Sequence, residues 1–176
     1  MGNLREEIYE WLKTIVIAVV IAMVITAFVR PTLVKGYSMY PTLNPYNYLI
    51  INKVPYMIHN PEKGDIVVFK SHLKTDRGGE KDLIKRVIAV EGDHIAVTDG
   101  KVSVNGEILD ENYINGEYTS GEIDLTVPKE TIFVMGDNRE NSLDSRDERV
   151  GFVPIDTVRG KVLVRLYPFN KIGTVK

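Results

Sequence analysis

Two residues in this sequence could together carry out nucleophilic catalysis, the serine Ser38 and the lysine Lys85. A serine hydroxyl becomes an effective nucleophile when a neighbouring base removes its proton. A lysine can be that base when burial disfavours its ammonium form and so lowers its pKa. The pair would suit hydrolysis of an acyl bond, provided that the fold brings the two side chains together.

The segment around Lys85 is typical of a strand that carries a cation in an apolar row. Because alternate strand residues point to opposite faces, Lys85 and its neighbour Arg86 lie on different faces, each among aliphatic residues of the segment 83–90. Arg86 stays charged when buried and therefore needs a carboxylate partner. An edge strand from which the lysine stem reaches solvent would explain the same pattern without catalysis.

Ser38 lies between Gly36 and Pro41, which restrict the backbone around it. Glycine allows another backbone to approach closely, and proline fixes a bend. This setting would suit an exposed hydroxyl and a free amide N–H, but it would also suit an ordinary turn serine. A third segment, residues 136–151, is dense in polar groups and is either a solvated loop or a hydrogen-bonded insert that positions a site.

The composition excludes several classes of site. The chain has no cysteine, which removes disulfides, thiolate zinc sites and a cysteine nucleophile. His59, His72 and His94 lack the spacing of metal ligands, so we expect no metal and no other cofactor. A net charge of −2 provides no basic field for a nucleic acid, which we do not expect as a partner.

A membrane anchor is predicted at the N-terminus. Residues 14–29 carry no charge, and the apolar stretch 11–29 is interrupted only by Lys13. As a helix it would span roughly 28 Å, close to the thickness of a bilayer core. The run has no polar face and is not followed by a small-residue cleavage site, which disfavours a core helix and a cleaved leader. Residues 1–30 are therefore predicted to be an anchor whose span covers about 12–29, although the flanking basic residues do not decide its orientation.

Residues 31–176 are predicted to form a mainly β domain, a folded sheet or open barrel of many short strands. The polar segments 71–81 and 112–124 are predicted to be surface loops, and no helix of useful length is expected after residue 31. Asp99-Gly100 predicts a tight hairpin. The expected strands are Thr32–Lys35, Tyr48–Val54, Asp65–Lys70, Leu83–Val90, Ile95–Thr98, Lys101–Val104, Thr131–Met135 and Arg159–Tyr167.

Taken in order, these segments resemble the type I signal peptidases over nearly the whole chain. After the apolar anchor, the family's characteristic segments match Ser38–Thr42, Gly64–Phe69, Lys85–Asp93 and Gly136–Arg146, followed by Gly151–Pro154. The short region between about 93 and 129 has room for only a small insertion, as in the single-anchor form. The base position holds lysine rather than the histidine of the endoplasmic reticulum and sporulation-type relatives.

The resemblance implies a membrane-bound serine endopeptidase that removes signal peptides from exported preproteins. It also implies a mainly β catalytic domain on the outer face of the cytoplasmic membrane, with the N-terminus inside and the lipid bilayer as a partner. In this scheme Ser38 is the nucleophile and Lys85 the general base. Ser142 would hydrogen-bond the Lys85 amine and aim it.

The resemblance also implies roles for the residues around this dyad. Asp144 and Arg146 would pair and brace their loop, and Asp137 is the candidate partner of Arg86. Gly36 stands where some members carry a serine that donates to the oxyanion, so here the donors would be backbone N–H groups. The residues expected to line shallow pockets for small substrate side chains are Val34, Met39 and Ile84.

Two other functions fit part of the pattern. An anchored β-domain without enzymatic activity could bind exported proteins or wall components, and it would leave Lys85 exposed and far from Ser38. A self-cleaving repressor on a related β fold would use a Ser-Lys pair in the cytosol and would need no anchor. The distance between the Ser38 hydroxyl and the Lys85 amine separates the first alternative from a peptidase.

Overall fold

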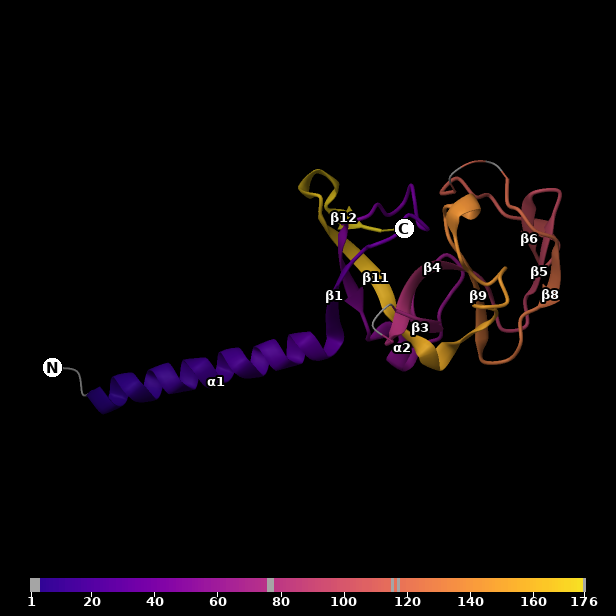
Figure 1. Ribbon diagram of the computed structural model, residues 1–176. Helices are drawn as coiled ribbons and strands as arrows, with labels where there is room; N and C mark the ends of the chain where they lie inside the picture. The colour runs from indigo at the N-terminus through magenta and orange to yellow at the C-terminus, as the bar shows by residue number, and fades with distance from the viewer. Residues whose placement is uncertain (1–3, 76–77, 115, 117, 176) are drawn as a thin grey trace.

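A long helix projects from a body built of two β-sheets (Figure 1). The computed structural model describes residues 4–75, 78–114, 116 and 118–175. Helix α1 (Leu4–Phe28) buries none of its residues, and its apolar stretch is long enough to cross a membrane. It ends just before Arg30-Pro31, because proline disfavours helical backbone in the residue that precedes it. This helix fits a single-pass membrane anchor, as expected.

The larger sheet is antiparallel and contains eight strands, with the order β1-β2-β11-β3-β4-β9-β10 and β12 beside β11. Its central strands β3 and β4 are long, and both contribute apolar residues to the buried core. The bounds are β1 (Val29–Leu33), β2 (Tyr48–Asn52), β3 (Ile66–Lys74), β4 (Glu80–Val90), β9 (Thr131–Met135), β10 (Val153–Pro154), β11 (Val158–Tyr167) and β12 (Gly173–Thr174).

The smaller sheet has four strands in the order β7-β6-β5-β8 and lies within the expected insertion. Asp99-Gly100 makes the turn between β5 and β6, with both residues at positive φ. The strands are β5 (His94–Thr98), β6 (Lys101–Val104), β7 (Glu107–Ile108) and β8 (Ile123–Thr126). Short helical turns complete the chain, namely α2 (Pro55–Ile58), η1 (Arg139–Asn141), η2 (Ile155–Thr157) and η3 (Phe169–Lys171).

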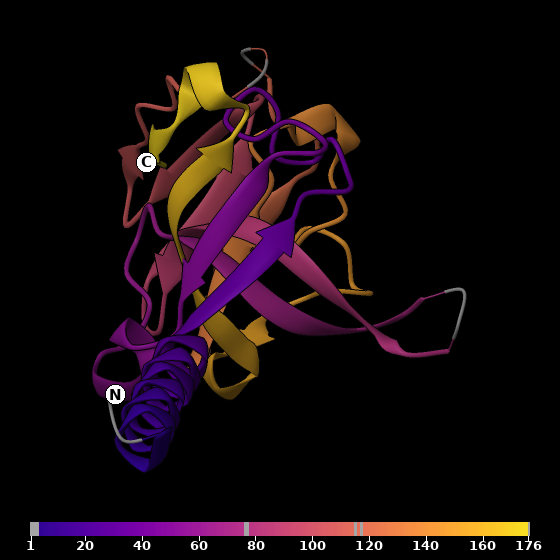
Figure 2. The same ribbon diagram turned by 90° about the vertical axis from the view of Figure 1, so that its left-hand side faces the viewer.

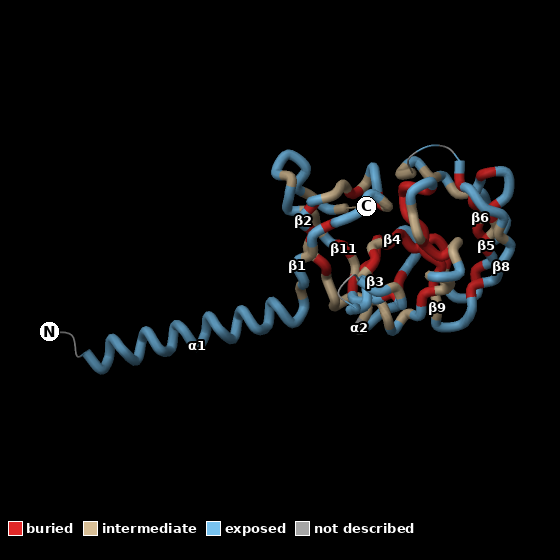
Figure 3. Tube along the Cα trace, viewed as in Figure 1, coloured by how far each residue is buried: buried red, intermediate tan, exposed pale blue. Residues whose placement is uncertain are grey.

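Burial follows the two sheets and leaves α1 fully exposed (Figure 3). One core cluster joins β4 and β9 to the small sheet. A second joins β2, β3 and β11 to the segment that carries Ser38. A third packs β3, β4 and β9 together. The prediction of a mainly β domain is therefore confirmed, and the large sheet places Lys85 near its centre.

Two loop predictions need correction. Most of the described part of the segment 71–81 is strand and not loop, because β3 runs to Lys74 and β4 begins at Glu80, reaching away from the body (Figure 2). Backbone pairing holds these polar residues, for example Lys74 opposite Glu80. Residues 76–77 of the predicted loop lie outside the described residues. The second error is β8, which begins inside the predicted loop 112–124 and pairs with β5. Its mostly exposed residues lack the apolar alternation that reveals a strand.

Candidate active site

The structure brings Ser38 and Lys85 into direct contact. Lys85 Nζ donates a hydrogen bond to Ser38 Oγ over 2.6 Å, although the residues are 47 positions apart in the chain. Lys85 comes from β4 and is only 2% exposed, so its stem does not reach solvent and the interpretation without catalysis is wrong on this point. Ser38 lies in a turn after β1 and is half-buried. The pair thus has the contact that proton transfer between hydroxyl and amine requires.

The environment of Lys85 favours its neutral form. Burial lowers the pKa of the Lys85 amine to about 8, and the nearby Asp144 carboxylate opposes this effect only partly. Desolvation lowers the pKa of an amine because the ammonium ion loses its hydration while the neutral amine loses little. A share of the Lys85 amine is therefore unprotonated near neutral pH and can accept a proton.

Backbone contacts from the segment after β9 hold the turn that carries Ser38. The Asn138 amide N–H donates to the Ser38 carbonyl over 3.0 Å, and the Asn138 side-chain amide donates to the Tyr37 carbonyl over 3.2 Å. The Thr42 hydroxyl donates to Asp137 over 2.5 Å. Asn138 and Thr42 were not predicted from the sequence to hold this turn, although both lie inside the family-like segments.

Asp137, which accepts the Thr42 hydroxyl, also forms a buried ion pair with Arg86. Arg86 donates through Nε and Nη2 to the two carboxylate oxygens of Asp137, each over 2.8 Å. The Asp137 side chain is 0% exposed and that of Arg86 only 4%. The Tyr113 ring lies 4.0 Å from the guanidinium carbon, so an aromatic face covers the cation. The carboxylate that the strand pattern demanded for Arg86 is thus supplied by Asp137.

Asp144 and Arg146 form a second forked pair. Arg146 donates through Nε and Nη2 to Asp144, each over 2.9 Å, and also to the Arg139 carbonyl. Asp144 in turn accepts the Gly136 amide N–H over 2.9 Å. Burial raises the pKa of Asp144, but the Arg146 guanidinium and the Gly136 amide more than offset this and hold the pKa below its usual value. The pair therefore links both ends of the polar segment.

The hydrogen bond expected from Ser142 to the Lys85 amine is not formed, which corrects that prediction. Ser142 Oγ is buried and has no hydrogen-bonding geometry with any residue that the structure describes. It comes near enough to Asp144 to help lower the pKa of that carboxyl. The reason is packing, because the Ser142 hydroxyl lies against Gly136 while the Lys85 amine is directed at Ser38 Oγ.

A groove of about 670 Å³ leads to the Ser38–Lys85 pair. One wall is residues 30–39, the other is residues 81–85 of β4. Both walls carry free strand edges: among the described residues β1 pairs only with β2, and β9 covers β4 only from Arg86 onward. The residues predicted to contact substrate all line this groove, namely Val34, Gly36, Met39 and Ile84.

Comparison with known proteins gives the family. The model of the family "signal peptidase, peptidase S26" matches residues 8–167. The chain belongs to this signal peptidase family. It is 40% identical over 166 residues to the probable signal peptidase I-2 of Synechocystis sp., covering 92% of this chain and 74% of that protein. It is 36% identical over 187 residues to signal peptidase IB of Staphylococcus aureus (strain COL), covering 96% and 94%.

A solved signal peptidase I from Enterococcus faecalis V583 is 33% identical, with a TM-score of 0.49, and covers 59% of this chain and 97% of that one. Membership of the signal peptidase family rests on the sequence matches and confirms the predicted enzyme class, a serine endopeptidase that cleaves signal peptides. It favours this activity over a non-enzymatic β-domain and over a repressor.

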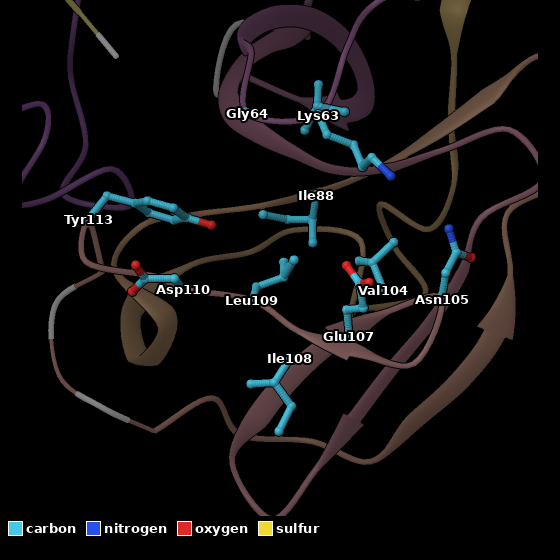
Figure 4. A pocket seen from close by; sticks show the side chains of 11 residues that line it. Lys63, Gly64, Ile88, Val104, Asn105, Glu107, Ile108, Leu109, Asp110 and Tyr113 are labelled. Atoms are coloured by element: carbon cyan, nitrogen blue, oxygen red, sulfur yellow. The ribbon is translucent and has the colours of Figure 1, made fainter.

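A second hollow, of about 590 Å³, lies between β4 and the small sheet (Figure 4). Its lining includes Lys63, Asn105, Glu107 and Tyr113 but neither member of the Ser38–Lys85 pair. It is therefore separate from the groove that leads to the Ser38–Lys85 pair. Within the described ranges, no three histidine, aspartate or glutamate side chains gather as metal ligands.

Gly136 is a site residue that the sequence analysis did not single out. A Cβ at this position would lie 2.2 Å from Ser142 Oγ and 2.4 Å from the Ser38 carbonyl oxygen. We expect Gly136→Ala to push the Ser38 turn away from Lys85, lowering peptidase activity by at least about 100-fold and the free energy of unfolding by about 1–3 kcal/mol.

Chemical denaturation and peptide cleavage would check this expectation. Gly36→Ala is the matched control for stability, because a Cβ at Gly36 meets no atom within 4 Å. Wild-type stability and activity in Gly136→Ala would contradict the steric argument.

Proposed function

We propose that Ser38 is the nucleophile and Lys85 the general base with which this chain cleaves signal peptides. The observation that carries the proposal is the 2.6 Å contact between Lys85 Nζ and Ser38 Oγ, with the amine buried. A buried amine of lowered pKa is the group that can accept a hydroxyl proton near neutral pH. Among the hydrogen bonds of the described residues, no other serine hydroxyl meets a lysine amine, because Ser71 Oγ donates to the backbone carbonyl of Lys81.

The reaction follows from this contact. The neutral Lys85 amine takes the proton of Ser38 as Oγ attacks the scissile carbonyl carbon. Backbone N–H groups, among them that of Ser38, hold the oxyanion, and one such donor is worth about 3–4 kcal/mol. The Lys85 ammonium so formed then donates this proton to the leaving nitrogen as the C–N bond breaks, so the mature protein departs first and Lys85 is neutral again. A water activated by Lys85 hydrolyses the acyl-enzyme and releases the signal peptide.

The groove supports binding of the substrate as an added strand. Its two free edges, on β1 and on the first half of β4, can hydrogen-bond an extended segment on both sides. Val34 and Met39 are almost fully buried in its floor, which leaves only shallow space beside them. Small side chains ahead of the scissile bond would fit there, whereas large ones would clash.

The anchor explains how substrate reaches the groove. We propose that α1 spans the cytoplasmic membrane with the N-terminus inside, and that residues 31–176 form the catalytic domain outside. The groove begins at Arg30, directly after α1, and ends at Ser38 and Lys85. The apolar segment of a signal peptide would lie in the bilayer beside α1, which raises its effective concentration at the groove.

The test is cleavage of a preprotein by the full-length, detergent-solubilised enzyme, with the cut mapped by mass spectrometry. We expect one cut, directly after a small residue of the signal peptide. Replacing that residue with tryptophan should lower kcat/KM by at least about 100-fold, because the shallow pocket rejects a bulky side chain.

A matched tryptophan placed well inside the mature part of the preprotein should leave the rate unchanged. Cleavage that tolerates tryptophan at the cut, or cuts scattered along the preprotein, would refute the assignment of the groove.

A further inference from the structure

A basic cleft lies where α1 meets the catalytic body. It holds about 660 Å³ and is lined by the end of the helix, β1, the residues after β2, β3 and the start of β11. Figure 2, which looks along the helix from its N-terminal end, faces the side of the body on which this cleft lies. The cleft adjoins the substrate groove. The two have only Arg30 and Pro31 as common lining residues, and the cleft contains neither Ser38 nor Lys85.

The position of this cleft relative to a bilayer follows from the apolar span. The charged residues of α1 lie near its start, and the uncharged run ends at Val29, directly before Arg30. A span over about residues 12–29 is roughly 27 Å long, close to the ~30 Å hydrocarbon core, so Arg30 lies at the border between the core and the headgroups. Arg30 lines the cleft, as does Thr26 one turn earlier, so the cleft opens toward the depth where headgroup phosphates lie.

The side chains around the cleft carry an excess of positive charge. Four cations line it, namely Arg30, Lys53, Lys70 and Arg159, against one lining carboxylate, Asp156. Two further carboxylates stand behind them: Asp82 pairs with both arginines, and Glu80 pairs with Lys70. One net positive charge remains, and the side chains of Arg30, Lys70 and Arg159 are 47%, 43% and 39% exposed.

Lys53 accounts for the unbalanced charge. Its ammonium group donates to the Thr26 carbonyl over 3.4 Å, at the end of α1. Within the described part of the chain Lys53 forms no ion pair. A cation held at the headgroup layer without a carboxylate attracts an anion, and such attraction to an anionic leaflet is worth about 1 kcal/mol per basic residue.

We propose that this cleft binds the phosphate of an anionic phospholipid headgroup, with Lys53 and Lys70 as its principal contacts. The proposal depends on the proposed membrane anchorage through α1. A lipid bound there would brace the catalytic body against the bilayer at the base of the groove. It would thereby hold the mouth of the groove toward the membrane in which the signal peptide lies.

The test uses the full-length protein in neutral detergent, with bound phosphatidylglycerol and phosphatidylcholine counted by native mass spectrometry. We expect wild type to retain phosphatidylglycerol preferentially. The double variant Lys53→Gln/Lys70→Gln should bind it at least about tenfold more weakly, since each lysine contributes roughly fivefold. The matched control, Lys101→Gln/Lys129→Gln, removes two exposed lysines away from the cleft and should bind like wild type.

Three results would overturn the proposal: equal retention of the two lipids by wild type, equal loss in both double variants, or displacement of phosphatidylglycerol by a similar concentration of inorganic phosphate. Cleavage of a soluble peptide in the same detergent distinguishes the lipid-binding proposal from the proposed peptidase function. The cleft variant should cleave it at the wild-type rate. A wild-type protein that binds the lipid but cuts no substrate would contradict the proposed function alone.

Discussion

Lys85→Met is expected to lower the rate of preprotein cleavage by about 10⁴-fold, because methionine fills the space of the lysine stem but cannot accept a proton. Lys85→Arg should be almost as inactive. Arginine keeps the charge and hydrogen-bond donors near Ser38, but it stays protonated at every working pH. Single-turnover cleavage of a preprotein by purified full-length enzyme measures both effects. An active Lys85→Arg enzyme would contradict the role of the amine as a base.

The pH dependence of the wild-type enzyme provides a second measure of the same role. The active form is the neutral amine, and burial lowers the pKa of Lys85 to about 8. The cleavage rate should therefore rise about tenfold per pH unit below that value and level off above it. A rate that is flat between acid and alkaline pH would argue against Lys85.

The lowered pKa of Lys85 should also make the stability of the protein depend on pH. The folded protein binds fewer protons than the unfolded chain between a pKa of about 8 and the ordinary lysine value of 10.5, so its stability rises with pH across this window. Below it, the buried amine costs about 3 kcal/mol. Lys85→Met removes this cost, so we expect a higher Tm than wild type near neutral pH and equal values at strongly alkaline pH.

Ser38→Ala is expected to abolish cleavage as completely, with a loss of at least about 10⁴-fold. The substitution removes only the hydroxyl. The backbone contacts of the Ser38 turn to Asn138 stay in place, so circular dichroism and the Tm should match wild type. Acid-quenched wild-type reactions should also contain a covalent adduct on the peptide that includes Ser38, and this adduct should be absent from Ser38→Ala.

Ser103→Ala on β6 is the control for Ser38→Ala. Ser103 lies in the small sheet and is not among the residues that line the groove at Ser38 and Lys85. It should cleave at the wild-type rate. Detecting the adduct on a different serine would assign the nucleophile to that residue. Near-normal turnover by Ser38→Ala would refute the assignment of Ser38 as the nucleophile.

Local sequence patterns were sufficient for the anchor and for the class of fold. The apolar run that ends at Arg30-Pro31 specifies α1 to within one residue of the observed end, because helix formation there depends on neighbouring residues only. Short apolar runs with turn residues between them located most strands of both sheets. They failed at the β3–β4 hairpin and at β8, where backbone pairing rather than an apolar face holds the strand.

The candidate site also has features that local sequence predicts and features that it does not. The residue types of Ser38, Lys85 and Asp137 and their order along the chain indicated the chemistry and the partner that Arg86 requires. The contact between Ser38 and Lys85, the orientation of Ser142 and the need for Gly136 depend on packing between segments distant in the chain.

The sequence by itself therefore determined which groups could react and which segment could enter a membrane, since residue type and local periodicity encode both. Only the tertiary structure decided which of these groups meet, how far the amine is removed from water, and where free strand edges and a basic cleft lie. The physical reason is that strand register and side-chain packing are set by long-range contacts, which no short stretch of sequence specifies.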